Sequence, residues 1–231
     1  MLAIAHRSGN TVAGLRAALD AGVDLVEADV HLHRGRLEVR HLRTMGGLPL
    51  LWDRTGVVHR RRWEPVELTE VLDALGADHR LMIDLKGVHP RLAPTVAGLL
   101  RSVAPDRSLT VCTKAWWMLD AFDLPVNRVL SAATGRGLSR LRERLATEPV
   151  QGTGSGTGHV TGPGSVRGVS VRVALLTREL VDELHRTTDL VMAWPVDTAA
   201  ALAHARAVGV DAVISKNLDL LRGVIAERGP G

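Results

Sequence analysis

The sequence has 231 residues, of which 45% are hydrophobic and 23% are charged, and its formal net charge is +4. This length fits one large domain, and the apolar fraction is sufficient for a complete core. No apolar run of about 18 residues is present, so no membrane span is expected. The single cysteine, Cys112, excludes an internal disulfide and fits a cytoplasmic protein. The first expected strand begins at Leu2, which leaves no room for a secretory signal.

The basic residues are scattered along the expected helices rather than gathered on one segment. His59–Arg62, followed by Trp63, is the one basic run. It could contact nucleic acid or lipid phosphate, but a solvated loop is favoured because no aromatic and basic platform accompanies it. We therefore expect no nucleic-acid partner. Only three of the 29 basic residues are lysines, Lys86, Lys114 and Lys216, which raises the question of whether the compact ammonium of lysine is required at these positions.

Apolar and helical patterns alternate along the whole chain. Eight strands are expected, over residues 2–6, 23–31, 80–86, 108–114, 128–132, 168–173, 190–196 and 212–216. Eight helical segments are expected, over residues 10–22, 68–75, 90–103, 116–122, 138–146, 178–186, 198–208 and 218–227. Such alternation implies parallel strands with right-handed crossovers, and eight strands favour a closed barrel over an open sheet. We predict an α/β fold, a single-domain (β/α)8 TIM barrel over residues 1–231.

Two segments fall outside this alternation. Leu42–Glu64 contains several glycines and arginines and is expected to be an irregular loop, which could cover a site. Gln151–Arg167 is rich in glycine but matches neither the Walker A pattern nor the dinucleotide-binding glycine pattern. It also follows a helix and precedes a strand, which places it on the barrel face opposite the mouth. A flexible connector is therefore the favoured interpretation of this second segment.

The segment Val23–His41 has an unusual acidic strand. Side chains alternate along a strand, so Glu27 and Asp29 share one face in a stretch apolar enough to be interior. Two neighbouring carboxylates repel each other and lose hydration when buried, and a divalent cation would offset both effects. An edge hairpin with a solvated acidic face is the alternative. Arg34-Gly35 predicts a turn, after which the chain brings His41 back toward the carboxylates.

Other unusual residues fall where expected strands end and helices begin, which is where TIM barrels carry their chemistry. These residues are His6, Glu27, Asp29, Asp84, Lys86, Lys114, Trp194 and Lys216. All three lysines of the chain are therefore expected at the mouth of the barrel. Random surface lysines would not share one position in the fold, so this placement strengthens the prediction of a site.

Glu27, Asp29 and Asp84 would supply three carboxylates to one centre. Oxygen ligands of this kind favour one Mg²⁺ or Ca²⁺ ion over zinc. The alternative is an internal salt-bridge cluster with Lys86. It is less favoured because we expect no arginine near these carboxylates.

His6 and His41 are the histidines expected beside the carboxylates, from different strands. A pair of histidines around a metal-bound phosphate can divide the roles of general base and general acid. His31 and His33 are expected to be ordinary loop or rim residues.

Four further residues complete the expected mouth. Arg7 and Lys86 are cations suited to phosphate oxygens. Trp194 and Lys114 are expected to contact the substrate, although a core position for Trp194 is nearly as well supported. Cys112 precedes Lys114 by two positions and is expected to belong to the core rather than to act as a nucleophile.

Taken together and in order, these motifs resemble the glycerophosphodiester phosphodiesterase family over nearly the whole chain. The residues that carry the resemblance are His6-Arg7, Asn10-Thr11, GVDLVEADV at 22–30, His41, IDLK at 83–86, AWPVD at 193–197 and GVDAVIS at 209–215. The resemblance implies a TIM barrel, a divalent metal, a catalytic histidine pair and a small-molecule phosphodiester substrate. It also implies hydrolysis of a glycerophosphodiester to glycerol 3-phosphate and an alcohol, in many members through a cyclic phosphate.

The sequence departs from the family pattern at several positions. Ser8 replaces the glycine that usually follows His-Arg, Gly9 stands where a glutamate usually precedes Asn10, and Leu42 replaces the aspartate after the second histidine. Asp84 replaces the usual glutamate. An aspartate at this position, followed two residues later by lysine, is similar to the pattern in the related sphingomyelinase D (phospholipase D) toxins. Cleavage of a lysophospholipid is therefore an alternative activity. A catalytically silent barrel that binds a phosphorylated ligand or a protein partner is another.

Overall fold

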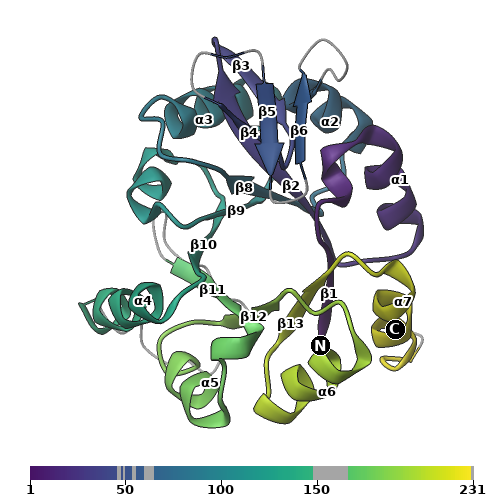
Figure 1. Cartoon of the computed structure of the whole chain (residues 1–231), viewed down its shortest axis with the longest axis vertical. Coiled ribbons are helices and arrows are strands. Elements are labelled where there is room, and N and C mark those ends of the chain that lie inside the picture. Colours follow the sequence, from purple (N-terminus) through teal and green to yellow (C-terminus); the bar gives the residue numbers. More distant parts are fainter. Residues whose placement is uncertain (46–47, 49, 54–55, 60–64, 148–165, 230–231) are drawn as a thin grey trace.

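A computed structural model describes residues 1–45, 48, 50–53, 56–59, 65–147 and 166–229. Eight parallel strands close into a barrel with helices outside it (Figure 1), which confirms the predicted (β/α)8 fold. Around the barrel the strands are β1 (Leu2–Ala5), β2 (Leu25–His33), β8 (Leu81–Leu85), β9 (Thr110–Thr113), β10 (Asn127–Ala132), β11 (Val166–Arg172), β12 (Leu190–Trp194) and β13 (Ala212–Ser215). Pairing of β13 with β1 and of β1 with β2 closes the ring.

Helical segments follow the barrel strands on the outside of the barrel, and all but the last connect one barrel strand with the next. They are α1 (Val12–Asp20), α2 (Leu68–Leu75), α3 (Leu92–Val103), the 3₁₀ helix Trp116–Ala121, α4 (Gly135–Thr147), α5 (Arg178–Leu184), α6 (Ala199–Val208) and α7 (Leu218–Ala226). Polar residues just after the strands begin several of them. The hydroxyls of Thr11, Thr177 and Thr198 each accept a hydrogen bond from a backbone N–H in the first turn of α1, α5 and α6.

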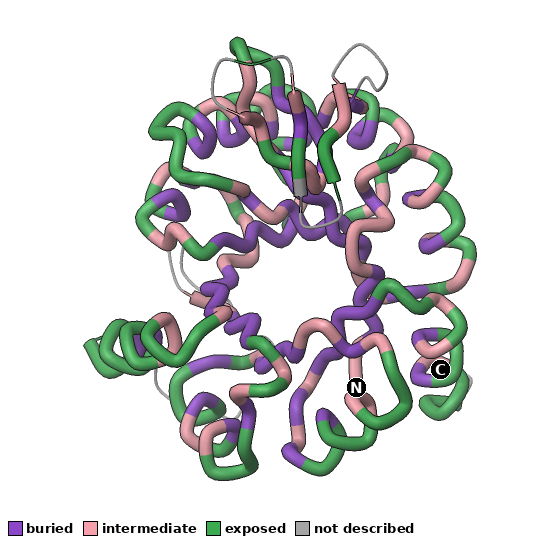
Figure 2. Tube along the Cα trace, viewed as in Figure 1, coloured by how far each residue is buried: buried purple, intermediate pink, exposed green. Residues whose placement is uncertain are grey.

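The hydrophobic core has two parts. The larger part fills the space between the strands and the surrounding helices, and Figure 2 shows buried residues concentrated on the strand ring. The smaller part fills the inside of the barrel with Ile4, Met82, Cys112, Val129, Met192, Ala212 and Ile214. Cys112 is thus a core residue, as predicted, and burial raises the pKa of its thiol well above the ordinary value. Met82, Cys112 and Ile214 of this inner cluster also line the cavity at the mouth of the barrel.

The prediction of an irregular loop over Leu42–Glu64 is wrong. A small antiparallel sheet forms there from β4 (Arg43–Thr44), β5 (Leu50–Asp53) and β6 (Gly56–His59). The hairpin strand β3 (Arg36–Val39) pairs antiparallel with β2, as the Arg34-Gly35 turn predicts, and with β7 (Val66–Glu67). The inserted strands are short and pair only with each other, so their apolar residues are too few to produce a clear alternation.

The helix expected after β9, the two unusual segments and the expected lack of a membrane span can also be compared with the structure. The helix expected over 116–122 is a 3₁₀ helix. Most of the glycine-rich connector Gln151–Arg167, and all of the basic run after His59, lie outside the described residues. None of the helices in the described part of the chain is both long enough and apolar enough to span a membrane.

Asp24 joins the two ends of the chain. Its carboxylate accepts a hydrogen bond from the Ala3 backbone N–H at 2.7 Å and two from the Arg228 guanidinium at 2.7 and 2.8 Å. Although partial burial raises the pKa of Asp24, the bonds from Arg228 and Ala3 together hold it below its ordinary value. This contact fixes the first barrel strand next to the C-terminal residues that follow α7.

We predict that Asp24→Ala lowers the free energy of unfolding by about 1–3 kcal/mol at neutral pH, because a buried N–H and a guanidinium lose their acceptor. Since the folded-state pKa is depressed, this stabilisation is present above the unfolded pKa of Asp24 and is lost as the pH falls through the folded value. Urea denaturation at neutral and acid pH measures both effects. Asp20→Ala, at an exposed position, is the control, with an expected change within about 0.5 kcal/mol. Equal stability of the two variants would contradict the prediction.

Candidate active site

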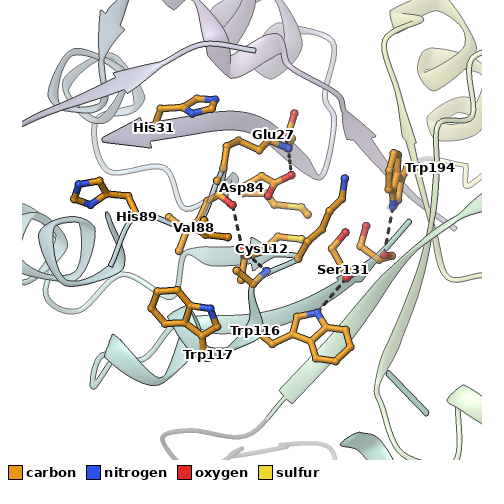
Figure 3. A pocket seen from close by; sticks show the side chains of 18 of the residues that line it. Glu27, His31, Asp84, Val88, His89, Cys112, Trp116, Trp117, Ser131 and Trp194 are labelled. Atoms are coloured by element: carbon orange, nitrogen blue, oxygen red, sulfur yellow. Dashed lines mark hydrogen bonds and ion pairs between the residues drawn. The ribbon is translucent and has the colours of Figure 1, made fainter. Parts of the chain in front are cut away.

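A cavity of about 1140 Å³ opens at the carboxyl ends of the barrel strands. Figure 3 shows it lined by residues from several strands, among them Glu27, Asp84 and Trp194. Apart from Lys216, all but one of the residues predicted for the mouth line this cavity: His6, Arg7, Glu27, His41, Asp84, Lys86, Lys114 and Trp194. The remaining one, Asp29, is fully buried directly behind the lining.

The register of β2 and β8 brings the three predicted carboxylates together. Asp29 and Asp84 are paired neighbours on the two strands, and Glu27 lies one inward-facing step earlier on β2. One oxygen from each carboxylate lies within 4.8 Å of the others. Parallel pairing of β2 and β8 therefore produces the cluster, which could hold a metal ion.

Lys86 lies in the middle of this acidic cluster. Its ammonium contacts the Asp84 carboxylate directly, lies 2.7 Å from Asp29 Oδ1, and lies 3.7 Å from Glu27 Oε1. Arg7 also contributes, because its Nε lies 3.6 Å from Asp29 Oδ2 and its backbone N–H donates to Glu27 Oε2 at 2.6 Å. The expectation that no arginine lies near these carboxylates is therefore wrong. Arg7 reaches them because its backbone is left-handed, with φ of 61°, a conformation that the sequence pattern does not reveal.

The charges of the cluster are only partly balanced. Burial, with the neighbouring charge of Asp29, raises the pKa of Glu27 well above its ordinary value. Asp29 is buried too, but Lys86 and the hydrogen bonds around it hold its pKa well below the ordinary value. Burial also raises the pKa of Asp84. Three carboxylates thus face two cationic side chains. The raised pKa of Glu27 indicates that a further positive charge at this place would be stabilised.

Asp29 is the centre of the hydrogen-bond network, and one of its partners is Asn10, which is not among the residues predicted for the site. The Asn10 amide donates to Asp29 Oδ2 at 2.9 Å, and its oxygen accepts from the Asp29 backbone N–H at 2.8 Å. The turn that carries Asn10 lies very close to β2: a Cβ on Gly9 would lie 2.8 Å from the Ala28 Cβ. Glycine is therefore required at position 9 for Asn10 to reach Asp29.

His41 also faces Asp29. Its Nδ1 lies 3.3 Å from Asp29 Oδ2, and the neighbouring Arg40 backbone N–H donates to the Asp29 carbonyl at 2.8 Å. The Arg40 side chain is buried and donates to Glu38 at 2.7 Å and to the Thr44 hydroxyl at 2.9 Å. This buried ion pair fixes the segment between β3 and β4 and so positions His41. A buried arginine is rare, and nothing in the local sequence distinguishes Arg40 from the many surface arginines.

His6 lies at the end of β1, next to the same cluster. Burial and the adjacent charge of Arg7 lower the pKa of His6 to about 3, so its ring is neutral near pH 7. Its Nδ1 is buried and has no hydrogen-bond partner among the described residues. A neutral, unpaired ring nitrogen inside the cavity is available to a ligand that brings its own proton.

The expectation that His31 is an ordinary rim residue is wrong. His31 lies on β2 and lines the cavity, and Figure 3 shows it near Glu27. Burial and the charge of Arg40 lower its pKa to about 3. β2 runs on to His33, so His31 lies within the strand and on the same face as Glu27 and Asp29. His89, in the connection between β8 and α3, also lines the cavity.

The opposite side of the cavity is aromatic and cationic. The Lys114 ammonium lies 4.8 Å from the ring centre of Trp194, and the Trp194 ring N–H donates to the Ser170 carbonyl at 3.3 Å. Trp116 donates to the Ser131 carbonyl at 3.0 Å, as Figure 3 shows. Lys216 follows β13 at the same end of the barrel but is not among the residues that line the cavity.

Comparison with known proteins bears on the fold of this chain. No family model matches the sequence, and no curated protein matches it. Among solved structures, a glycerophosphodiester phosphodiesterase from Thermotoga maritima superposes with a TM-score of 0.68 at 17% identity, over 97% of this chain and 98% of that one. A glycerophosphodiester phosphodiesterase from Agrobacterium tumefaciens gives a TM-score of 0.64 at 17% identity, over 98% of this chain and 99% of that one.

A phosphodiesterase from Oleispira antarctica, in complex with the product sn-glycerol-3-phosphate, is similar to the same extent. Its TM-score is 0.71 at 17% identity, over 98% of this chain and 97% of that one. These likenesses cover nearly the whole chain. At such identities they show that the chain has the fold of these phosphodiesterases.

Proposed function

We propose that this chain is a phosphoric diester hydrolase of the glycerophosphodiester phosphodiesterase family, which cleaves a glycerophosphodiester to glycerol 3-phosphate and an alcohol. The observation that carries the proposal is the convergence of His6 and His41 on one buried carboxylate cluster that also holds Arg7 and Lys86. The barrel shared with solved phosphodiesterases, one of them bound to sn-glycerol-3-phosphate, supports it.

The same cluster fits one Mg²⁺ or Ca²⁺ ion. Glu27, Asp29 and Asp84 supply the carboxylate oxygens that these hard cations prefer, within 4.8 Å of each other. The raised pKa of Glu27 indicates that the cluster lacks positive charge. When bound, the ion would polarise a phosphoryl oxygen and neutralise negative charge that develops in the transition state.

The side chains around the cluster have the chemistry that phosphodiester cleavage needs. Arg7 and Lys86 donate charged hydrogen bonds and would orient two phosphate oxygens. His6 and His41 come from different segments, so one ring can take a proton from the attacking group while the other gives a proton to the departing alcohol. Contact with Asp29 favours one orientation of the His41 ring.

A covalent enzyme intermediate is not part of this proposal. None of the described serine, threonine and cysteine side chains makes a hydrogen bond to His6 or His41, so none has a base to activate it. The attacking group is instead the substrate hydroxyl next to the phosphate. Its oxygen bonds to phosphorus as one histidine takes its proton, the bond to the alcohol breaks as the other histidine protonates that oxygen, and water then opens the cyclic phosphate.

A catalytically silent barrel that binds a phosphorylated ligand is the second candidate. The contact of Lys86 with all three carboxylates favours it, because an ammonium in this position already compensates part of the buried negative charge. The two candidates differ in whether a divalent cation enters the cluster and whether a diester is turned over. The following experiments separate them.

The first prediction concerns the metal. Added Mg²⁺ or Ca²⁺ should raise the melting temperature, because a ligand that binds only the folded state stabilises it, by about 2.7 kcal/mol at one hundred times its Kd. Asp84→Asn should remove this shift, whereas Asp120→Asn, at an exposed position on the far side of the cavity, should keep it. Chelation should abolish activity. Full activity after EDTA treatment, or a wild-type shift in Asp84→Asn, would show that the metal site is misassigned.

The second prediction concerns the histidine pair. His6→Ala and His41→Ala should each lower turnover of glycerophosphoglycerol by at least about 10²-fold, the usual contribution of a positioned proton donor or acceptor. His79→Ala is the control, since His79 is exposed and does not line the cavity. Circular dichroism checks that the variants are folded. Turnover of His41→Ala near the wild-type level would refute the assignment.

The third prediction concerns the attacking group. A diester with a free hydroxyl beside the phosphate should react far faster than the same compound with that hydroxyl methylated, because only the free hydroxyl can attack phosphorus. Phosphorus NMR during turnover should show a cyclic phosphate, either transient or accumulating. Equal rates for the two compounds, with no cyclic species, would indicate direct attack by water.

A further inference from the structure

The cavity is larger than the reacting part of a glycerophosphodiester requires. Its volume of about 1140 Å³ exceeds the range of about 300–1,000 Å³ typical of sites for drug-sized ligands. The carboxylate cluster occupies one side of it. Figure 3 shows Trp116 and Trp117 on the other side, across from Glu27 and His31. This second side is therefore the place available to the alcohol part of a substrate.

Aromatic rings commonly bind quaternary ammonium groups such as choline, but here the protein's own cations lie over two of the rings. The Lys114 ammonium is 4.8 Å from the Trp194 ring centre, and the Arg140 guanidinium is 5.6 Å from that of Trp116. A cationic alcohol placed on either ring would meet a like charge at close range. Both cations would instead attract an anion.

The charged residues that line this second side of the cavity also favour an anionic ligand. Outside the carboxylate cluster, the described cavity lining contains the cations Arg43, Lys114, Arg140 and Arg144 and the carboxylates Asp120 and Glu143. Among the described residues, no carboxylate oxygen forms an ion pair with Lys114 or Arg140. The positive charge of these two side chains is therefore available to a ligand.

We propose that Lys114 and Arg140 form a second anion site in this cavity, which binds a phosphate carried by the alcohol part of the substrate. The inference rests on the proposed function for the reacting end of the substrate. It specifies in addition which class of alcohol the diester carries. Diesters whose alcohol bears a second phosphate are preferred, neutral alcohols follow, and cationic alcohols are the poorest substrates.

Kinetics with three diesters tests this order: glycerophosphocholine, glycerophosphoglycerol and bis(glycerophospho)glycerol, which carries a second phosphate. In the wild type, kcat/KM for bis(glycerophospho)glycerol should exceed that for glycerophosphocholine at least about tenfold, the effect of one charged hydrogen bond. Lys114→Gln and Arg140→Gln should each reduce this ratio toward one. Arg136→Gln, an exposed position on α4 outside the cavity lining, should leave it unchanged. Equal kcat/KM of the wild type for glycerophosphocholine and for bis(glycerophospho)glycerol would overturn the proposal. A ratio of these two values that stays at the wild-type level in both Lys114→Gln and Arg140→Gln would also overturn it.

Calorimetric binding separates this inference from the proposed function. If the wild type cleaves none of the three diesters, the proposed function fails, and titration with intact bis(glycerophospho)glycerol decides about the anion site. Binding that weakens at least about tenfold in Lys114→Gln and in Arg140→Gln, but not in Arg136→Gln, supports the site. Equal binding by all four proteins, or no binding, overturns it.

Discussion

The candidate site depends on the burial of three carboxylates around one lysine. Removing a charge from water costs several kcal/mol per ion unless a partner of opposite charge compensates it. The paired register of Asp29 and Asp84 forces this proximity, and Lys86 and Arg7 compensate part of it. The other groups at the mouth are arranged around the same charges, since both Asn10 and His41 face the Asp29 carboxylate. A change in the register of β2 and β8 would therefore disrupt the whole site.

Most of the fold could be predicted because each repeat of the barrel has its own local signal. Buried strands appear as apolar runs, and threonine or asparagine caps mark the helices that follow. α2 (Leu68–Leu75) coincides with its predicted range. The inserted sheet over β4–β6 could not be predicted in this way. Its strands contain two to four residues and pair antiparallel with each other, so their stability comes from pairing rather than from a local pattern.

The contacts within the site were predictable only where they follow the strand pattern. Glu27, Asp29 and Asp84 lie on barrel strands, so alternation and strand order bring them together. Asn10 reaches the site from a turn that requires glycine at the preceding position. Arg7 reaches it through a left-handed backbone conformation. Such contacts depend on how loops fold back onto the barrel, and no periodicity in the sequence encodes them.

We propose that the three carboxylates hold a divalent cation beside Lys86. Anomalous diffraction from crystals grown with Mn²⁺, as a substitute for Mg²⁺, tests it most directly. We predict one anomalous peak between Glu27, Asp29 and Asp84, with carboxylate oxygens about 2.0–2.6 Å away, the range of hard-cation ligands. The Lys86 ammonium should move away from the carboxylates. An empty cluster at saturating Mn²⁺, with Lys86 still in contact with all three carboxylates, would contradict it.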